Sequence, residues 1–454
     1  MKLYFYGGAE EVTGVKYLLE IPINNKKTVK ILIDCGLIQG DKEAHNKNFE
    51  PFPFDARQID YLLITHAHVD HVGLAPKLYK HGFRGVAFMT PPTKDLASLT
   101  LCDSQKIMEK ESWRDGREPM FGEKDVAGFL ELITTVKYGK KQKLQDEIYF
   151  RFNDAGHMLG SSIIEIWAEG KKIVFSGDLG NAPTPLLKNP TKITEADYIL
   201  VESTYGDKIH ENRIERKEIL ENIIEETCAQ RGVLMIPAFA VERTQELLSE
   251  LNELAENNRI PKVPIFVDSP LAVKSTKVYG KYIDYFNKNA VKQMKNGDDL
   301  FNFPGLVYTE EQQASKTINS VAPPKIIIAG SGMSTGGRIL FHEKLYLPDI
   351  KSCLIISNYQ VKGTMGRRLL EGEKNVKIFD ENIPVKAKIA SIQGYSSHAD
   401  QKALYDWINN FIKPVKHVWM VQGEKESAEA LALIVKDRLG IPASVPKFGE
   451  VVEL

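Results

Sequence analysis

The sequence contains few cysteines, and none of them are close together. Its four cysteines are Cys35, Cys102, Cys228 and Cys353, with no C-x-x-C pair among them. This argues against a disulfide framework and for a reducing compartment. No apolar run approaches membrane-spanning length, and the segment that starts at Met1 has the pattern of a strand, not of a signal peptide. These absences predict a cytoplasmic protein with no membrane partner.

The chain also lacks an excess of charge of either sign. Its 59 basic and 60 acidic residues leave a formal net charge of −1. No global basic surface for nucleic acid is therefore expected, and an anionic substrate would have to be bound by a local basic patch or by metal ions. With 454 residues, of which 43% are hydrophobic, the chain is long enough for two or three domains and has the composition of a soluble globular enzyme.

Histidine is scarce, but its distribution is uneven. Of the ten histidines, His66, His68 and His71 fall within six positions together with Asp70, directly behind the apolar run 61–64. Neutral imidazoles and carboxylates are the ligands that zinc and similar ions take. Side chains two apart in an extended segment share a face, so His66 and His68 can bind one ion, while Asp70 and His71 could reach a second. The alternative, a polar loop with incidental histidines, does not explain this concentration.

Several apolar segments with a strand pattern end in a potential ligand. The carboxylates in such places are Asp34 after residues 28–33, Asp178 after residues 172–175 and Glu202 after residues 198–201. His157 lies between glycines, where the backbone can bend to aim its ring. A sheet whose strands end in this way builds a site at one edge. For Asp34 a turn or cap role is the alternative, but beside a metal site we expect it to hold a metal-binding histidine or a neighbouring loop.

From about residue 208 the pattern changes to apolar strands that alternate with helices. Such alternation indicates a parallel sheet covered on both faces, and ligands of these sheets bind beyond the carboxyl ends of the strands. The Gly-rich loop 330–338 precedes a helix and suits a phosphate, although a tight turn for close helix packing is the alternative. The candidate substrate contacts at these strand ends are Arg243, Ser269, Ser331, Gly332 and Lys362. For each of them, an ordinary surface or capping role is equally open.

Taken in order, these motifs resemble the metallo-β-lactamase superfamily. Its signature is matched by His66-x-His68-x-Asp70-His71, then Gly156-His157, then Ser176-Gly177-Asp178. The inserted α/β segment, with Glu202 and His398, resembles more narrowly the β-CASP nucleases, which include the endonuclease of eukaryotic cleavage and polyadenylation factor and its bacterial and archaeal relatives. The resemblance covers essentially the whole chain. It implies an α/β fold, in which an αββα sandwich formed by residues 1–207 and 385–454 carries an inserted β-CASP domain at residues 208–384.

The resemblance also implies a centre with two zinc ions. His66, His68 and His157 would hold one ion, Asp70 and His71 would hold the other, and Asp178 would bridge them. Glu202 would pair with His398, which would protonate the leaving oxygen as general acid. The implied activity is a zinc-dependent ribonuclease that cleaves single-stranded RNA with a metal-bridged hydroxide, in RNA processing or degradation. The catalytic set implied in this way is Asp70, Asp178, Glu202 and His398.

One position departs from the family pattern. Where RNA-acting members have a histidine that completes the second metal site and DNA-acting members have an apolar residue, this chain has Gln422. A neutral amide oxygen is a weak ligand, so the second site is expected to bind its metal loosely, to prefer another metal, or to fill only with substrate. His417 is a poor substitute, because five residues along a strand span roughly 16 Å and reverse the face.

Two other functions stay open on the sequence alone. A catalytically weak RNA-binding protein would keep the fold, and Gln422 is the feature that favours it. A small-substrate metallohydrolase would use the same metal scaffold, but the inserted domain and the Glu202–His398 pair argue against it. Endonucleolytic and exonucleolytic cleavage use the same centre and are not separated by the sequence, and a homodimer is compatible with it.

Overall fold

The computed structural model describes residues 1–24 and 27–454, which form two compact units. The first unit contains residues 1–182, 189–209 and 398–454, and the second contains residues 183–188 and 210–397. The resemblance implied a second boundary at residue 384, but strand β19 (Lys388–Ser391) pairs with β16 (Cys353–Ile356) in the sheet of the second unit. Residues 385–397 therefore belong to that unit. A short strand pattern does not reveal which of two sheets the strand joins.

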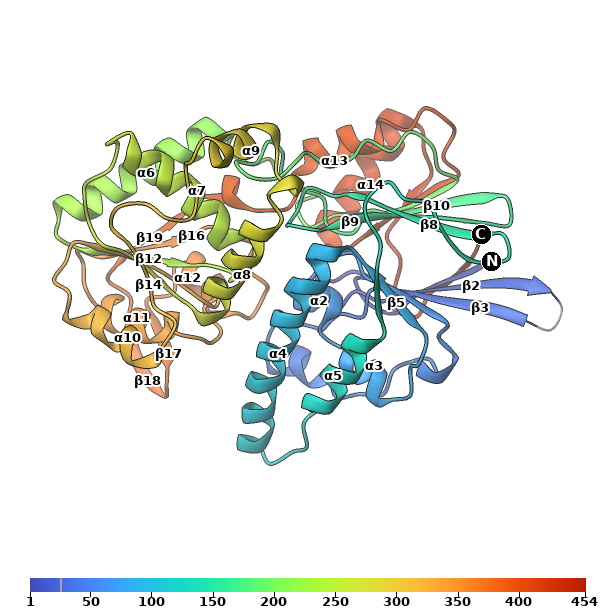
Figure 1. The fold of residues 1–454 in the computed structure, drawn as a ribbon, viewed down its shortest axis with the longest axis horizontal. Coiled ribbons are helices and arrows are strands. Elements are labelled where there is room, and N and C mark those ends of the chain that lie inside the picture. Colours follow the sequence, from blue (N-terminus) through green and yellow to red (C-terminus); the bar gives the residue numbers. More distant parts are fainter. Residues whose placement is uncertain (25–26) are drawn as a thin grey trace. The chain divides into compact units, whose positions relative to one another are not determined.

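Two seven-stranded sheets form the centre of the first unit (Figure 1). The first has the order β22-β1-β2-β3-β4-β5-β6 and the second the order β21-β20-β11-β10-β9-β8-β7. The strands of the first sheet are β1 (Lys2–Phe5), β2 (Tyr17–Asn24), β3 (Lys27–Ile33), β4 (Tyr61–Leu63), β5 (Val86–Met89), β6 (Ile133–Thr135) and β22 (Val451–Glu453). Those of the second are β7 (Gln142–Gln145), β8 (Ile148–Asp154), β9 (Ser162–Ala168), β10 (Lys171–Phe175), β11 (Tyr198–Glu202), β20 (His417–Val421) and β21 (Ala443–Ser444).

Apolar side chains from the two sheets form one shared core. Alternate residues of several strands, such as Leu3 and Phe5 in β1 and Phe150 and Phe152 in β8, point into it and are fully buried. A second apolar cluster joins the outer face of the second sheet to two helices, through residues such as Val418 and Leu431. The helices of this unit are α1 (Lys42–Lys47), α2 (Val69–Val72), α3 (Ala75–Lys80), α4 (Pro91–Arg114), α5 (Glu123–Glu131), α13 (Gln401–Ile408) and α14 (Lys425–Leu439). The layers are therefore αββα, as expected.

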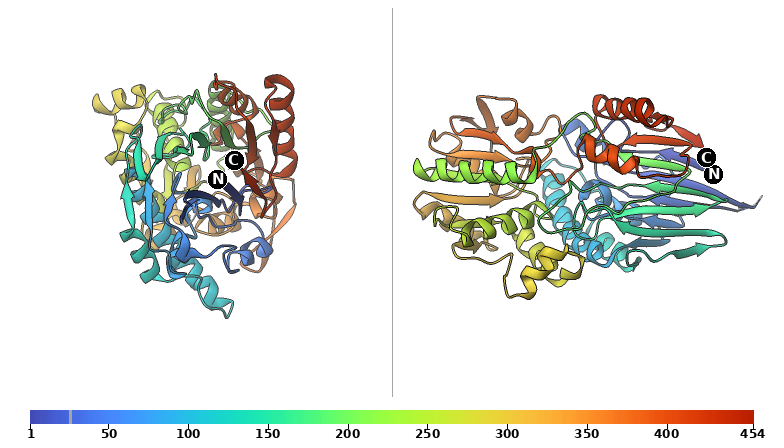
Figure 2. Two further views of the ribbon diagram at one scale, coloured as in Figure 1. Left: turned by 90° about the vertical axis from the view of Figure 1, so that its right-hand side faces the viewer. Right: turned by 90° about the horizontal axis from the view of Figure 1, so that it is seen from above.

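Because neighbouring strands are parallel, the carboxyl ends of several strands lie at one edge of each sheet. Strands β3, β4, β5 and β6 are parallel neighbours, as are β10, β11 and β20. The loops that follow β4, β10, β11 and β20 carry the residues singled out in the sequence. The two ends of the chain lie side by side in each view (Figure 2), because β22 pairs with β1.

The second unit is built on a six-stranded parallel sheet with the order β14-β13-β15-β12-β16-β19. The other strands of this sheet are β12 (Val233–Pro237), β13 (Ile265–Asp268), β14 (Leu306–Tyr308) and β15 (Lys325–Ala329). Helices cover both faces (Figure 1), and a hairpin of β17 (Asn375–Ile378) and β18 (Glu381–Pro384) packs beside them. The helices are α6 (Arg213–Ala229), α7 (Arg243–Glu256), α8 (Pro270–Lys281), α9 (Lys288–Lys295), α10 (Gln312–Thr317), α11 (Ile339–Tyr346) and α12 (Met365–Leu370). The continuous apolar strands thus form the doubly covered parallel sheet that they predict.

A buried network of side-chain ion pairs connects helix α6 to helix α7 within this unit. Arg216 on α6 contacts Glu246 and Glu250 on α7 at 2.9 and 2.8 Å, and its other nitrogen donates to the carbonyl of Gly394 at 2.5 Å. The hydroxyl of Tyr395 donates to Glu250. The side chain of Arg216 is only 2% exposed, so its charge is balanced by these carboxylates and not by water.

Replacing Arg216 by methionine is expected to lower the free energy of unfolding by about 3–5 kcal/mol, because Glu250 would then be buried without a counter-charge and Glu246 would keep only that of Arg243. Urea denaturation followed by fluorescence measures the change. Lys377→Met is the matched control, since the ion pair of Lys377 with Asp380 is mostly exposed and contributes little. Equal losses in both variants would contradict the role assigned to Arg216.

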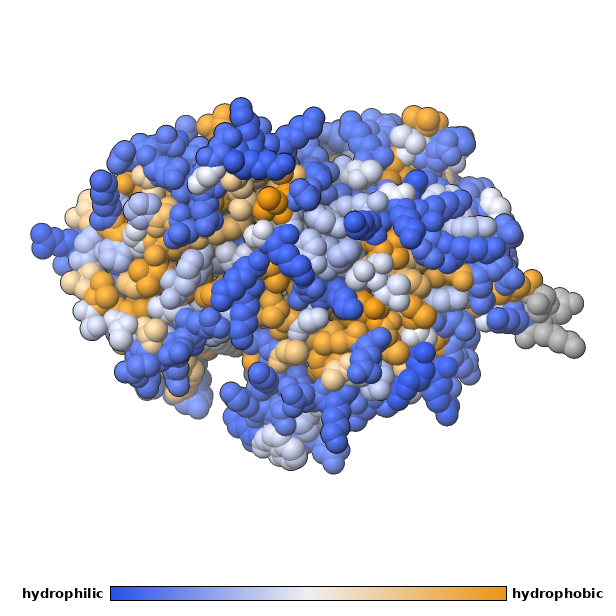
Figure 3. Space-filling model, in the orientation of Figure 1, coloured by the Kyte–Doolittle hydropathy of each residue, from blue (hydrophilic) through white to orange (hydrophobic). Residues whose placement is uncertain are grey.

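The surface agrees with the balanced composition. On the face shown in Figure 3, hydrophilic side chains are interspersed with smaller apolar patches. Among the described residues, no helix is both long and apolar enough to cross a membrane.

Candidate metal centre

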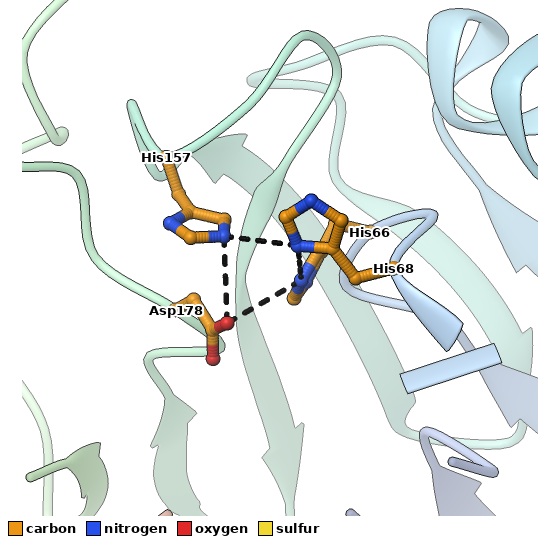
Figure 4. Close-up of side chains that lie close together, drawn as sticks. All are labelled: His66, His68, His157 and Asp178. Carbon is orange, nitrogen blue, oxygen red and sulfur yellow. Dashed lines mark hydrogen bonds and ion pairs between the residues drawn. The ribbon is translucent and has the colours of Figure 1, made fainter. Parts of the chain in front are cut away.

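Four side chains from separate parts of the first unit point toward one another (Figure 4). His66 lies just after β4, and His68 precedes the first turn of α2. His157 lies in the loop between β8 and β9, where Gly156 and Gly160 both have a positive φ that other residues adopt with strain. Asp178 lies in the loop after β10. The structure therefore brings together the first predicted ligand set with the predicted bridging carboxylate.

The distances between these ligand atoms suit a metal ion with tetrahedral coordination. His66 Nε2 and His157 Nε2 lie 3.1 and 3.2 Å from His68 Nδ1, and 3.4 and 3.5 Å from Asp178 Oδ2. For metal–nitrogen bonds of about 2.0–2.1 Å, the edges of a ligand tetrahedron are about 3.3 Å long. Three imidazoles and one carboxylate are also the donor types that zinc prefers. The residues present therefore fit a zinc ion.

Burial and neighbouring charges shift the pKa values of these groups in the directions that favour binding of a cation. Burial lowers the pKa of His68 and of His157 well below the ordinary value, so both rings are neutral and can bind a metal through a ring nitrogen. Burial alone raises the pKa of Asp178, but the imidazoles of His71, His66 and His398 outweigh it and hold that pKa well below its usual range. The centre thus presents the neutral imidazoles of His68 and His157 and one ionised carboxylate.

Asp70 and His71 lie on α2, beyond the other oxygen of Asp178. His71 Nε2 is 3.3 Å from Asp178 Oδ1 and 4.0 Å from Asp70 Oδ2. Its Nδ1 is 2.7 Å from Asp34 Oδ2, and Asp34 also accepts hydrogen bonds from the backbone N–H and the hydroxyl of Thr65 at 2.7 and 2.8 Å. Asp34 thus contacts both the ring of His71 and the loop that carries His66, which are the groups that it was predicted to hold. Its role there stays a prediction.

Glu202 and His398 form a carboxylate–imidazole pair beside Asp178, like the pair of Asp34 and His71. His398 Nδ1 is 3.0 Å from Glu202 Oε2 and 3.8 Å from Asp178 Oδ2. Glu202 is fully buried at the end of β11, where its other oxygen accepts a hydrogen bond from the backbone N–H of Leu179. Burial alone would lower the pKa of His398, but Glu202 and Asp178 outweigh burial and raise that pKa to about 9. His398 is therefore protonated at neutral pH and can donate a proton.

Gln422 completes the ring of residues around Asp178. It follows β20 and is 2% exposed, with a positive φ of 53°. Its side-chain nitrogen donates a hydrogen bond to Asp178 Oδ1 and lies 3.3 Å from His71 Nε2. His417, at the other end of β20, is hydrogen-bonded to Ser444 instead. Gln422 therefore contacts both Asp178 and His71. Its effect on a second metal site stays a prediction.

Comparison with known proteins accounts for the whole chain. Three family profiles match in order: a metallo-β-lactamase superfamily domain at residues 23–195, a β-CASP domain at 244–369 and a Zn-dependent metallo-hydrolase RNA specificity domain at 382–446. Ribonuclease TTHA0252 of Thermus thermophilus is 37% identical and is aligned over 99% of both chains. The chain belongs to the β-CASP family of metallo-β-lactamase hydrolases.

Further relatives agree with this family, and one solved structure shares the fold. The RNase J-like protein of Methanocaldococcus jannaschii is 31% identical over 100% of this chain and 99% of its own. Transcription termination factor FttA of the same organism is 29% identical over 98% of this chain and 71% of its own. A protein of unknown function from Enterococcus faecalis shares the fold, with a TM-score of 0.53 at 11% identity over 100% of this chain and 99% of that one.

The predicted substrate contacts all lie in the β-CASP unit, at the carboxyl edge of its parallel sheet. Ser269 caps helix α8, and the hydroxyl of Ser331 contacts that of Thr335 at 3.1 Å. The carbonyl of Gly332 accepts two side-chain hydrogen bonds from the loop after β16, in which Lys362 is exposed. Arg243 differs, because it is fully buried.

The burial of Arg243 has a simple physical cause. Its guanidinium pairs with Glu246 and lies 3.2 Å from Glu242, at the start of helix α7. In this structure Arg243 balances the charge of buried carboxylates and is not exposed to solvent. This is a structural role, in contrast to the substrate contact predicted for it. Ser269, Ser331, Gly332 and Lys362 stay predictions for the contact with RNA.

Sequence reasoning missed two polar side chains near the centre. The hydroxyl of Thr65 lies 3.0 Å from His66 Nδ1 and 3.2 Å from His71 Nδ1, so it touches one ring from each ligand set. Its position directly before His66 was the available signal. Tyr17 is 2% exposed, and its hydroxyl has no hydrogen-bond partner among the described residues. A tyrosine in an apolar strand gives no signal of this kind.

Proposed function

We propose that the protein is a zinc-dependent ribonuclease that hydrolyses phosphodiester bonds of single-stranded RNA, in RNA processing or degradation. The observation that carries this proposal is the tetrahedral spacing of His66, His68, His157 and Asp178 directly beside the Glu202–His398 pair. A relative aligned over nearly the full length is named a ribonuclease, and a domain named for RNA specificity matches residues 382–446.

The residues of the centre have separate tasks in this proposal. His66, His68, His157 and Asp178 would hold a zinc ion, which supplies Lewis-acid activation of water near neutral pH and offsets negative charge on the phosphate. His71, on α2, lies beside the carboxylate of Asp178, and Asp70 lies next to His71. The metal charge also explains how a chain with a net charge of −1 binds a polyanion.

His398 supplies the proton that the departing oxygen needs. Its ring is protonated, it is held by Glu202, and its side chain is 18% exposed, so a substrate can reach it. A general acid lets the alkoxide leave as a neutral hydroxyl, which is worth about 10²–10⁴-fold in rate. This pair favours phosphodiester cleavage over the hydrolysis of small thioester or lactam substrates.

Removal of the metal is expected to abolish cleavage of a labelled single-stranded RNA. Activity should return with Zn²⁺ but not with Mg²⁺, because three imidazole ligands suit zinc and not magnesium. Gel analysis of the products measures this, and the product lengths also separate endonucleolytic from exonucleolytic cleavage. RNA binding without cleavage at any metal loading would instead support a catalytically weak RNA-binding protein.

A further inference from the structure

The two oxygens of Asp178 face different surroundings. Oδ2 faces His66 and His157, whereas Oδ1 points away from the three histidines in Figure 4. Oδ1 accepts a hydrogen bond from the side-chain amide of Gln422 and lies 3.3 Å from His71 Nε2. The oxygen that would have to contact a second ion is therefore already bonded to a donor from this chain.

The side chain of Gln422 is held in this place by its backbone. The N–H of Gln422 donates to the carbonyl of Gly8 at 2.8 Å, and its carbonyl accepts from the hydroxyl of Thr204 at 2.9 Å. The preceding carbonyl, of Val421, accepts from Ser203 at 2.8 Å. These bonds fix a left-handed backbone conformation that glutamine adopts only at some cost. The amide therefore reaches Asp178 from an anchored position.

The side chain of Gln422 is also packed against Gly8. A Cβ atom at Gly8 would lie 2.6 Å from the hydroxyl oxygen of Tyr17 and 3.2 Å from Cγ of Gln422. Tyr17 and Gln422 thus fill the room that the missing side chain of Gly8 leaves. An ion between Asp178 and His71 would require the amide to give up its hydrogen bond to the carboxylate and to turn its weaker, neutral oxygen inward.

We propose that this protein holds one tightly bound zinc ion per chain, at His66, His68, His157 and Asp178, and that the Gln422 amide occupies the place of a second ion between Asp178 and His71. The inference rests on the zinc centre of the proposed function and specifies its stoichiometry. Gln422 acts as a positioning residue, because its hydrogen bond orients Asp178 for the single ion.

The test is the zinc content of full-length protein that is saturated with Zn²⁺ and then dialysed against metal-free buffer, measured by mass spectrometry. We expect one zinc per chain in the wild type and two in Gln422→His, because imidazole replaces the amide as a ligand. Gln422→Glu should also bind two, since its anionic oxygen has nearly the same reach, and it serves if the histidine variant fails to fold. Gln312→His, at an exposed position, controls for adventitious binding and should keep one.

The outcomes separate this inference from the proposed function. Two tightly bound ions in the wild type would overturn the inference while the zinc ribonuclease stands. One ion in the wild type and in both Gln422 variants would show that Gln422 is not what excludes the second. A wild type that retains no zinc would overturn the metal centre itself, and with it both proposals.

Discussion

Replacement of Asp178 by asparagine is expected to lower the rate of RNA cleavage by at least about a thousand-fold, which corresponds to about 4 kcal/mol of lost transition-state stabilisation. Asp178 lies 3.4 Å from His66 Nε2 and 3.3 Å from His71 Nε2, and its ionised form is favoured by the imidazoles around it. Asparagine keeps the shape of the side chain but removes the negative charge that holds a cation. The prediction is checked by single-turnover cleavage of a labelled RNA together with zinc content.

Asp437→Asn is the matched control, because Asp437 is exposed on α14 of the same unit. It should retain both its zinc and its activity. An Asp178→Asn variant that cleaves RNA at a rate within about tenfold of the wild type would contradict the place of this residue in the centre.

Replacement of His398 by alanine is expected to slow RNA cleavage by about 10²–10⁴-fold but to change the hydrolysis of bis(p-nitrophenyl) phosphate by much less. The nitrophenolate ion leaves without protonation, so a general acid contributes little to that reaction. The RNA alkoxide needs the proton that His398 Nε2 can donate while Nδ1 faces Glu202 at 3.0 Å. Comparing kcat/KM for the two substrates measures the difference.

Glu202→Gln should show the same selectivity with a smaller loss, because it weakens the support of His398 but leaves its ring in place. Equal losses on both substrates in His398→Ala would show that the histidine serves binding or metal retention instead of proton transfer. Zinc content should be unchanged in both variants, which separates these explanations.

Much of the centre could be predicted because its residues are close together in sequence or follow apolar strands. His66, His68, Asp70 and His71 lie in one short segment, and Asp178 and Glu202 come at the ends of parallel strands, where side chains converge. The pattern of hydrophobic residues likewise predicted the parallel sheet of the second unit, because continuous apolar strands are buried on both faces. The αββα layers were implied by the resemblance to the metallo-β-lactamase superfamily.

What could not be predicted depends on partners that are distant in the chain. Nothing in the local sequence shows that Arg243 is buried against Glu246, or that the strand at residues 388–391 joins β16. The hydrogen bond from Gln422 to Asp178 links residues far apart in sequence, and Tyr17 lies in an ordinary apolar strand. Propensity and periodicity describe a residue and its near neighbours, so such pairings appear only in three dimensions.

The pairing of strand β11 with β20 sets the order in which the protein can fold during synthesis. The second unit is nearly contiguous, and residues 210–397 leave the ribosome before the strand that β11 needs. The second sheet of the first unit therefore stays incomplete, with apolar side chains uncovered, until β20, β21 and α14 have been synthesised. An inserted domain that folds early shortens the path between the two halves, which lowers the entropy cost of joining them.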